Sequence, residues 1–295
     1  MPDHRTERPQ ARHLRYARQW IAFACVFGLL LWLGLSPPAQ AQSTAGVQAG
    51  ATLGPGETLP PYRAFMPLLA YDLPALPVQT YAAIPVLGPP VDREPEFNAD
   101  LNLAMRSYIS TTAPLNLVDI NGPTDPDAPQ LTGLLSPTRP PTIVRAYQVD
   151  EWDWSCSAVG CRGEPIANPA VTMIALAATP GEAVYIPTRG PEIHGGGYRA
   201  MVLYATADRI TLTYTREDTP AIGYLVHIEE IAVESNLVAL YEELHAGGRV
   251  HLPALRNGDR IGRATFATVK VVVRDTGSFM DPRSRKDWWQ GFLQQ

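Results

Sequence analysis

The sequence predicts a mainly β protein, with a compact β-sandwich or barrel-like domain, one short helix and a preceding proline-rich extended segment. Short runs of β-branched and alternating apolar residues recur after Val144, as where Ile210, Leu212 and Tyr214 alternate with threonines. The chain also has 29 prolines in 295 residues, many of them before position 142. Because proline interrupts helices, this distribution excludes long helical bundles and coiled coils. The 45% apolar and 18% charged residues are typical of a globular protein.

The first 41 residues have the pattern of an export signal. Arginines precede an apolar stretch from Trp20 to Leu35, and an Ala39-x-Ala41 motif follows, which predicts cleavage between Ala41 and Gln42. The alternative is an uncleaved membrane anchor, although the stretch is shorter than the roughly 20 residues that a bilayer span needs. Either way the chain is expected outside the cytoplasm, secreted or at the cell surface. Membrane contact is expected only through this segment, if it is retained.

The net charge narrows the classes of partner. The export segment carries five arginines and two acidic residues, so its removal changes the net charge from −5 to −8. No basic stripe remains for nucleic acid, which excludes nucleic acid as a partner.

Cys156 and Cys161 follow the export segment, and a close cysteine pair in an exported chain predicts a disulfide. The alternative is a zinc half-site, although no second cysteine or histidine pair lies nearby.

Two segments precede the β domain. Residues 42–97 are rich in proline and are expected to form a leader or linker, either as extended chain laid over the domain or as a spacer. Residues 98–143 are expected to form a short helix and loops that pack on the core. The helix is predicted over 100–109, with Asp100 as its cap.

Residues 144–295 are expected to form the β domain. Strand-like runs occur at 171–177, 182–187, 199–206, 209–215, 222–229 and 269–275. Ser235 is expected to cap one short helix, which the glycines at 247–248 end. Its buried face is expected to comprise Leu237, Leu240, Tyr241 and Leu244. Asn257-Gly258 is typical of a hairpin turn.

Three motifs follow one another in this domain: TPGEAVYIP at 179–187, GYLVHI at 223–228 followed by Leu240-Tyr241, and RNGDRIGR at 256–263. In this order they resemble segments of the lysostaphin-like zinc metallopeptidases, which cut peptidoglycan cross-links. The run RDTGSFMDPRSRKDWW at 274–289 also resembles uncharacterised exported proteins of filamentous green bacteria, a likeness that implies no activity.

The metallopeptidase resemblance implies metal ligands at four positions that have none. The matching residues are Val171, Ala175, Val269 and Val271. A metal needs nitrogen, oxygen or sulfur donors, so the resemblance implies a degenerate domain without catalytic residues or cofactor. The most favoured function is therefore that of a non-catalytic exported module for binding or assembly at the cell envelope, with an envelope polymer or a surface protein as its partner.

Two alternatives belong to other functional classes. One is an active zinc hydrolase acting on peptidoglycan, with His227 and Glu229 on one strand face and His251 completing the ligand set. The other is a structural subunit of a larger surface complex, in which residues 42–97 wrap a partner.

Weaker chemical motifs have simpler interpretations. His194 and the three glycines after it resemble a lipase oxyanion loop, but a flexible connection is the simpler interpretation because no Gly-x-Ser-x-Gly elbow is present. Asp208, Glu217 and Asp218 are candidates for the paired acids of a glycosidase, or are solvated turn residues.

The aromatic residues near charged side chains have two interpretations. Arg283, Arg285, Trp288 and Trp289 form either a surface for sugar rings or an anionic polymer, or a latch that packs its tryptophans onto the domain. The Trp152-Asp-Trp154 motif beside the cysteine pair has the same two interpretations.

Overall fold

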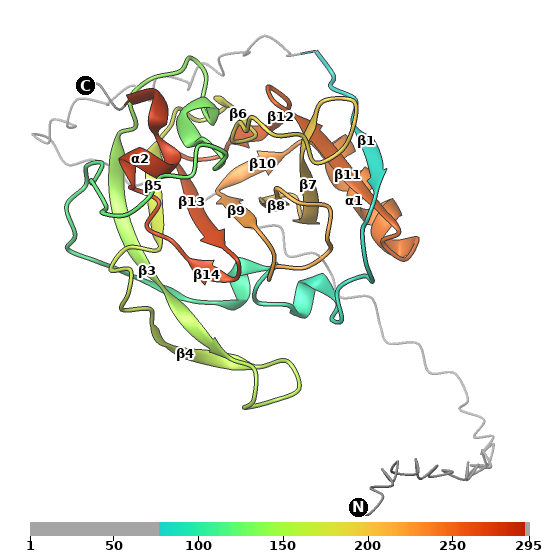
Figure 1. Cartoon of the computed structure of the whole chain (residues 1–295), viewed down its shortest axis with the longest axis horizontal. Helices are drawn as coiled ribbons and strands as arrows, with labels where there is room; N and C mark the ends of the chain where they lie inside the picture. The colour runs from blue at the N-terminus through green and yellow to red at the C-terminus, as the bar shows by residue number, and fades with distance from the viewer. Residues whose placement is uncertain (1–76, 293–295) are drawn as a thin grey trace, which may run out of the picture. The chain divides into compact units, whose positions relative to one another are not determined.

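The computed structural model describes residues 77–292 (Figure 1). The expected export signal at 1–41, its cleavage site at Ala41–Gln42 and the proline-rich segment up to residue 76 lie outside the described residues. The prediction of a mainly β fold with one main helix is confirmed. The strands form two antiparallel sheets, and neither sheet closes into a barrel.

The larger sheet has eleven strands, in the order β1-β11-β7-β8-β9-β13-β5-β3-β2, with β14 paired to β13 and β4 paired to β3. Its strands are β1 (Ala82–Pro85), β2 (Tyr108–Ser110), β3 (Ile143–Asp153), β4 (Cys161–Pro165), β5 (Met173–Ala177), β7 (Tyr198–Ala205), β8 (Arg209–Thr213), β9 (Tyr224–Glu229), β11 (His251–Arg256), β13 (Thr268–Asp275) and β14 (Ser278–Phe279). The smaller sheet has the order β10-β12-β6. Its strands are β6 (Ala183–Tyr185), β10 (Ile231–Val233) and β12 (Arg260–Ala264).

The central strands are covered on both faces. In β9, the neighbours Val226, His227 and Ile228 point alternately to opposite faces, and all three are buried. Most core residues form one large apolar cluster. A second, smaller cluster comprises Leu103, Tyr147, Val149, Ile166, Met173, Ala175 and Val272. Burial on both faces explains why these strands have nearly continuous apolar runs in the sequence.

The main helix, α1 (Ser235–Ala246), lies against β11. The prediction that Ser235 caps it is wrong, because Glu234 occupies the cap position and Ser235 is the first helical residue. Leu237 and Tyr241 are buried, and the helix ends at Gly247 as predicted. Within residues 77–292, no helix has both the length and the apolar character needed to cross a bilayer.

The helix predicted over 100–109 is absent from the structure. A single 3-10 turn, η2 (Leu103–Met105), is followed by the strand β2. The Asn102 side chain accepts a hydrogen bond from the amide of Ala104 at the start of the turn. The chain then pairs with β3, with Tyr108 opposite Val149. Sheet pairing therefore outweighs the local helical pattern here.

The Asn257-Gly258 pair forms a turn but not the predicted hairpin. The amide of Asp259 donates to the carbonyl of Arg256 (3.0 Å), and Gly258 has a positive φ of 86°. However, β11 before the turn pairs with β7 and β1, whereas β12 after it pairs with β10 and β6. The turn therefore transfers the chain from one sheet to the other.

The described part of the proline-rich segment belongs to the domain. Ile84 of β1 is buried, and β1 forms an edge of the large sheet by pairing with β11. Residues 87–97, which we call the strap, continue from this edge. The amide of Leu87 donates to the carbonyl of Arg216 (2.8 Å). The described domain therefore begins before residue 98.

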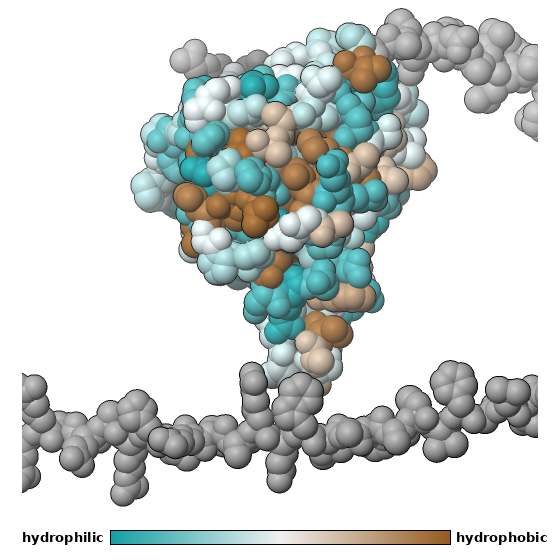
Figure 2. Space-filling model, turned by 90° about the vertical axis from the view of Figure 1, so that its right-hand side faces the viewer, coloured by the Kyte–Doolittle hydropathy of each residue, from teal (hydrophilic) through white to brown (hydrophobic). Residues whose placement is uncertain are grey.

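The surface around the β1 edge is mixed in character. Figure 2 shows hydrophobic residues gathered near the middle of this face and hydrophilic residues around them. Val78 and Val250, which lie next to β1 and β11, are exposed apolar residues, at 84% and 64% exposure. Single exposed apolar side chains are normal for a folded protein and mark no site by themselves.

Candidate functional site

The four predicted degenerate metal positions do not converge in the structure. Val269 and Val271 pair with Leu176 and Ile174 and lie with Val171 in the large apolar cluster. Ala175 pairs with Lys270, which places its side chain on the opposite face, in the small cluster. All four residues are buried. These positions therefore contribute to two separate parts of the core.

The alternative zinc set of His227, Glu229 and His251 is not assembled. Exposed His251 is on β11 and pairs with β1, whereas His227 is buried on β9, with β7 and β8 between the two strands. Across the described part of the chain, no three His, Cys, Asp or Glu side chains are grouped to hold a metal ion. Strand order separates His251 from His227 and Glu229, and the sequence alone does not reveal that order.

His227 has a defined hydrogen bond on one side of its ring. The Thr211 hydroxyl donates to the carbonyl of Leu101 (2.6 Å), so it accepts from His227 Nδ1 (2.9 Å). His227 Nε2 is buried and has no hydrogen-bond partner among residues 77–292. Burial, together with the nearby cations Arg274 and Arg106, holds the pKa of His227 well below its ordinary value. The imidazole is therefore neutral.

The predicted acidic residues have different surroundings. Asp208 pairs with Arg209 (2.8 Å) in the turn between β7 and β8. Asp218 is buried and pairs with Arg249 (2.6 Å). Glu217 and Asp218 line a groove on the domain surface, whereas Asp208 lies outside its lining. His194 stacks near Tyr198, with ring centroids 6.4 Å apart, in the connection before β7.

Of the two interpretations of the C-terminal aromatic residues, the structure supports the latch, because both tryptophans are buried. Trp288 and Trp289 are each 2% exposed, and their indole nitrogens donate to the carbonyls of Asp281 and Pro282. Arg283 is also buried and pairs with Asp281 (2.7 Å). Arg285 pairs with Asp119 (3.2 Å). The tryptophans and Arg283 therefore fasten the C-terminal segment to the domain.

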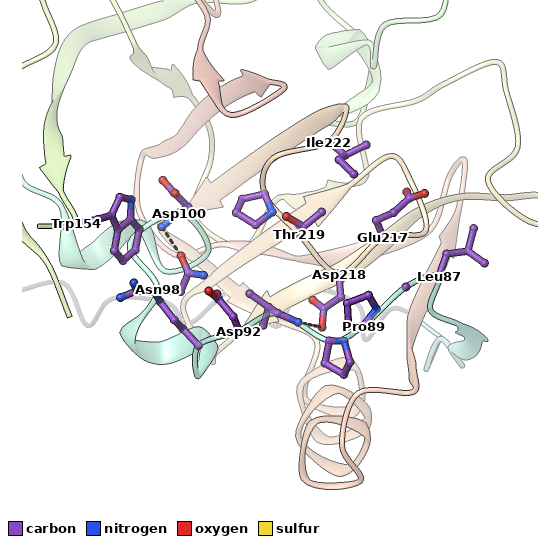
Figure 3. Close-up of a pocket in the computed structure, with 15 residues that line it drawn as sticks. Leu87, Pro89, Asp92, Asn98, Asp100, Trp154, Glu217, Asp218, Thr219 and Ile222 are labelled. Atoms are coloured by element: carbon purple, nitrogen blue, oxygen red, sulfur yellow. Dashed lines mark hydrogen bonds between the residues drawn. The ribbon is translucent and has the colours of Figure 1, made fainter. Parts of the chain in front are cut away.

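A groove of about 650 Å³ lies in the described part of the chain (Figure 3). One wall is formed by residues 87–93 of the strap, and another by residues of the 217–222 loop. Asn98, Asp100 and Trp154 complete the lining. The volume lies within the roughly 300–1,000 Å³ typical of small-ligand pockets.

Buried ion pairs hold the acidic side chains at the base of the groove. Arg249 donates to both carboxylate oxygens of Asp218 (2.6 and 2.7 Å), and the amide of Val91 on the strap donates to the same carboxylate (3.2 Å). Asp100 Oδ1 lies 2.7 Å from Arg106 and 2.9 Å from Arg274. These contacts neutralise Asp218 and Asp100 and connect the strap to the domain.

Trp154 is presented by a projecting hairpin, which we call the arm, formed by β3 and β4 (Figure 1). A disulfide between Cys156 and Cys161 closes its tip, as predicted, and is typical of a non-reducing, extracytoplasmic setting. The Trp154 ring packs edge-to-face with Trp152, with ring centroids 6.0 Å apart. Trp152 in turn packs on Gly160, where a Cβ atom would overlap the indole ring.

Arg93 joins the arm to the strap. Its guanidinium carbon lies 4.4 Å from the centroid of the Trp154 ring, within the range of a cation–π contact. Its Nη1 also donates to the carbonyl of Ala158 at the arm tip (3.0 Å). The half-buried Trp154 ring is therefore held at the groove by Trp152 of the arm and by Arg93 of the strap.

Three polar side chains of the groove retain hydrogen-bonding capacity. Asn98 is only 4% exposed, and its Oδ1 accepts from the amide of Asp100 (3.0 Å; Figure 3). Within residues 77–292, Asn98 Nδ2 has no hydrogen-bond partner, and Asp92 and Glu217 form no ion pair. The groove thus combines an indole ring, an amide donor and two acceptor carboxylates.

Trp154, Glu217 and Asp218 are candidates from the sequence, but the groove that they line is not predicted by it. The lining comes from three regions that are far apart in the chain, 87–100, Trp154 and 217–222, and the strap falls in the segment expected to be a leader or linker. The local signals are the Trp152-Asp-Trp154 motif and the neighbouring acids Glu217 and Asp218. Comparison of the chain with protein-family models, with curated proteins and with solved structures gives no match.

Proposed function

We propose that this chain is an exported, non-catalytic protein that binds a polymer of the cell envelope through the groove. The observation that carries the proposal is the half-buried Trp154 ring, held at a concave site beside side chains with unused hydrogen-bonding capacity. Indole rings supply a large apolar surface at little entropic cost, and the polar groups beside them orient a ligand.

The construction of the groove favours binding without large rearrangement. The ion pairs of Asp218 and Asp100, the disulfide and the Arg93 contact hold its walls together. A preorganised site avoids part of the entropy cost of ordering side chains and loops on binding. This supports a stable recognition role for the groove.

The location and the non-catalytic role have separate support. The export pattern at 1–41 and the disulfide are consistent with secretion to the cell envelope. The motifs similar to the peptidoglycan-cutting metallopeptidases favour an envelope polymer as the ligand. The aliphatic side chains at the four matching positions favour binding over hydrolysis.

Co-sedimentation with isolated, protein-stripped cell envelope tests the proposal. We expect the purified, oxidised protein to sediment in a saturable manner, and Trp154→Ala to weaken binding by about tenfold or more, as for an aromatic hot spot. Phe266→Ala is the matched control, because Phe266 is an exposed aromatic residue outside the groove lining. Absence of sedimentation, or equal losses in both variants, would contradict the proposal.

A further inference from the structure

We infer that the groove selects a glycan segment that carries no negative charge. This inference rests on the proposed function, because it concerns the ligand of the same groove. Some polar groups of the groove are free to contact a ligand, whereas others are already held in hydrogen bonds or ion pairs.

The groove is suited to reading a ligand through side chains rather than through main-chain pairing. An extended peptide that adds to a sheet needs a row of free backbone N–H and C=O groups. Pro89 and Pro90 on the strap have no N–H group, and the amide of Val91 already donates to Asp218. The main chain of this wall therefore offers no such row, which favours a ligand with many hydroxyl groups over an extended peptide.

The free side chains match the hydroxyl groups and the apolar face of a sugar. Asn98 Nδ2 can donate to a ring or hydroxyl oxygen, and the carboxylates of Asp92 and Glu217 can accept from hydroxyl groups. The apolar face of a pyranose ring can pack on the part of the half-buried Trp154 indole that Arg93 and Trp152 leave exposed. These groups come from different walls of one groove, so a single oligosaccharide can contact all of them.

The same carboxylates disfavour an anionic ligand. Asp100 and Asp218 are neutralised by arginines, but Asp92 and Glu217 form no ion pair in the described part of the chain. Arg93 is the cation in the lining, and it is occupied by the Trp154 ring and the carbonyl of Ala158. A uronate or phosphate would therefore face two unpaired like charges unless Arg93 left the ring.

Titration with two soluble oligomers of equal length tests the inference. The probes are an N-acetylglucosamine oligomer, which is neutral, and a galacturonic acid oligomer, which is anionic, at one low ionic strength. We expect the neutral oligomer to bind with a Kd about tenfold or more below that of the anionic one. The inference is overturned if the anionic oligomer binds as tightly, or if a neutral extended peptide binds more tightly than the neutral oligomer.

A charge-removal pair identifies the source of the selectivity. Asp92→Asn with Glu217→Gln is expected to reduce the preference to within about threefold, because the amides remove the repulsion and retain an acceptor. Glu242→Gln with Glu243→Gln changes the net charge equally on the exposed face of α1, away from the groove lining, and is expected to keep the preference. An unchanged preference in the first variant overturns the inference.

The outcomes separate this inference from the proposed function. If neither oligomer binds but the protein still sediments with envelope in a Trp154-dependent manner, the choice of ligand is wrong and the envelope-binding role stands. If sedimentation itself is absent, the proposed function fails.

Discussion

The buried pair of Asp218 and Arg249 at the base of the groove provides a quantitative test of the structure. The two side chains are 0% and 5% exposed and share two hydrogen bonds. Asp218→Ala leaves the guanidinium with the carbonyl of Leu203 and the hydroxyl of Tyr241 but no counter-charge. Breaking a buried pair in this way costs about 3–5 kcal/mol. For a domain of this size, that loss corresponds to a fall in Tm of about 6–20 °C.

Thermal unfolding followed by circular dichroism measures this loss against a matched control. Asp208 also pairs with an arginine, but its side chain is 64% exposed, so Asp208→Ala is expected to cost at most about 1 kcal/mol. The double change Asp218→Leu with Arg249→Met removes both charges and is expected to recover most of the lost stability. Equal losses of stability for Asp218→Ala and Asp208→Ala would refute the claim that the pair of Asp218 and Arg249 is desolvated and stabilises the base of the groove.

Three further predictions concern other parts of the fold. Because the folded-state pKa of His227 is lowered, the unfolded chain binds its proton more readily, so stability is expected to fall as pH drops below about 6.5. His227→Gln should reduce this pH dependence of Tm, whereas His251→Gln at an exposed position should retain it. Trp288→Ala is expected to cost about 3–5 kcal/mol in denaturant unfolding, and a loss below 1 kcal/mol would contradict its burial. Ser235→Ala should change stability by less than about 0.5 kcal/mol, because Ser235 is not the N-cap of α1. A larger loss, typical of a removed N-cap, would show that Ser235 caps the helix.

Local patterns predicted the elements that depend on alternation along the chain. The runs that became β8, β9 and β13 were predicted because their apolar residues follow strand periodicity. The end of α1 was predicted because glycine at 247 stops the helix. In these segments the local preference and the tertiary environment agree.

The remaining elements depend on partners that are distant in the chain. Residues 108–110 became a strand because they pair with β3, although their sequence also fits a helical pattern. The Asn257-Gly258 turn connects two sheets because the partners of β11 and β12 differ. The proline-containing strand β1 is an edge strand, the position in a sheet that tolerates proline.

Contacts between distant segments also explain why the groove was not predicted as a site. Trp154 and Glu217 were candidates from the sequence, but Asn98 and Asp92 become part of a site only because the strap and the 217–222 loop meet. The sequence around Trp288 and Trp289 fits either a binding surface or a latch, and their packing in the interior selects the latch. Sequence spacing does not distinguish an exposed aromatic pair from a buried one.

Envelope binding through the groove is tested by the ratio of the Kd of Trp154→Ala to that of the unmodified protein on isolated cell envelope. Binding through the groove predicts a ratio of about ten or more, with Phe266→Ala near one and all three proteins equally folded. A ratio near one for Trp154→Ala, with binding otherwise intact, would show that the envelope is recognised elsewhere and would contradict the groove as the binding site.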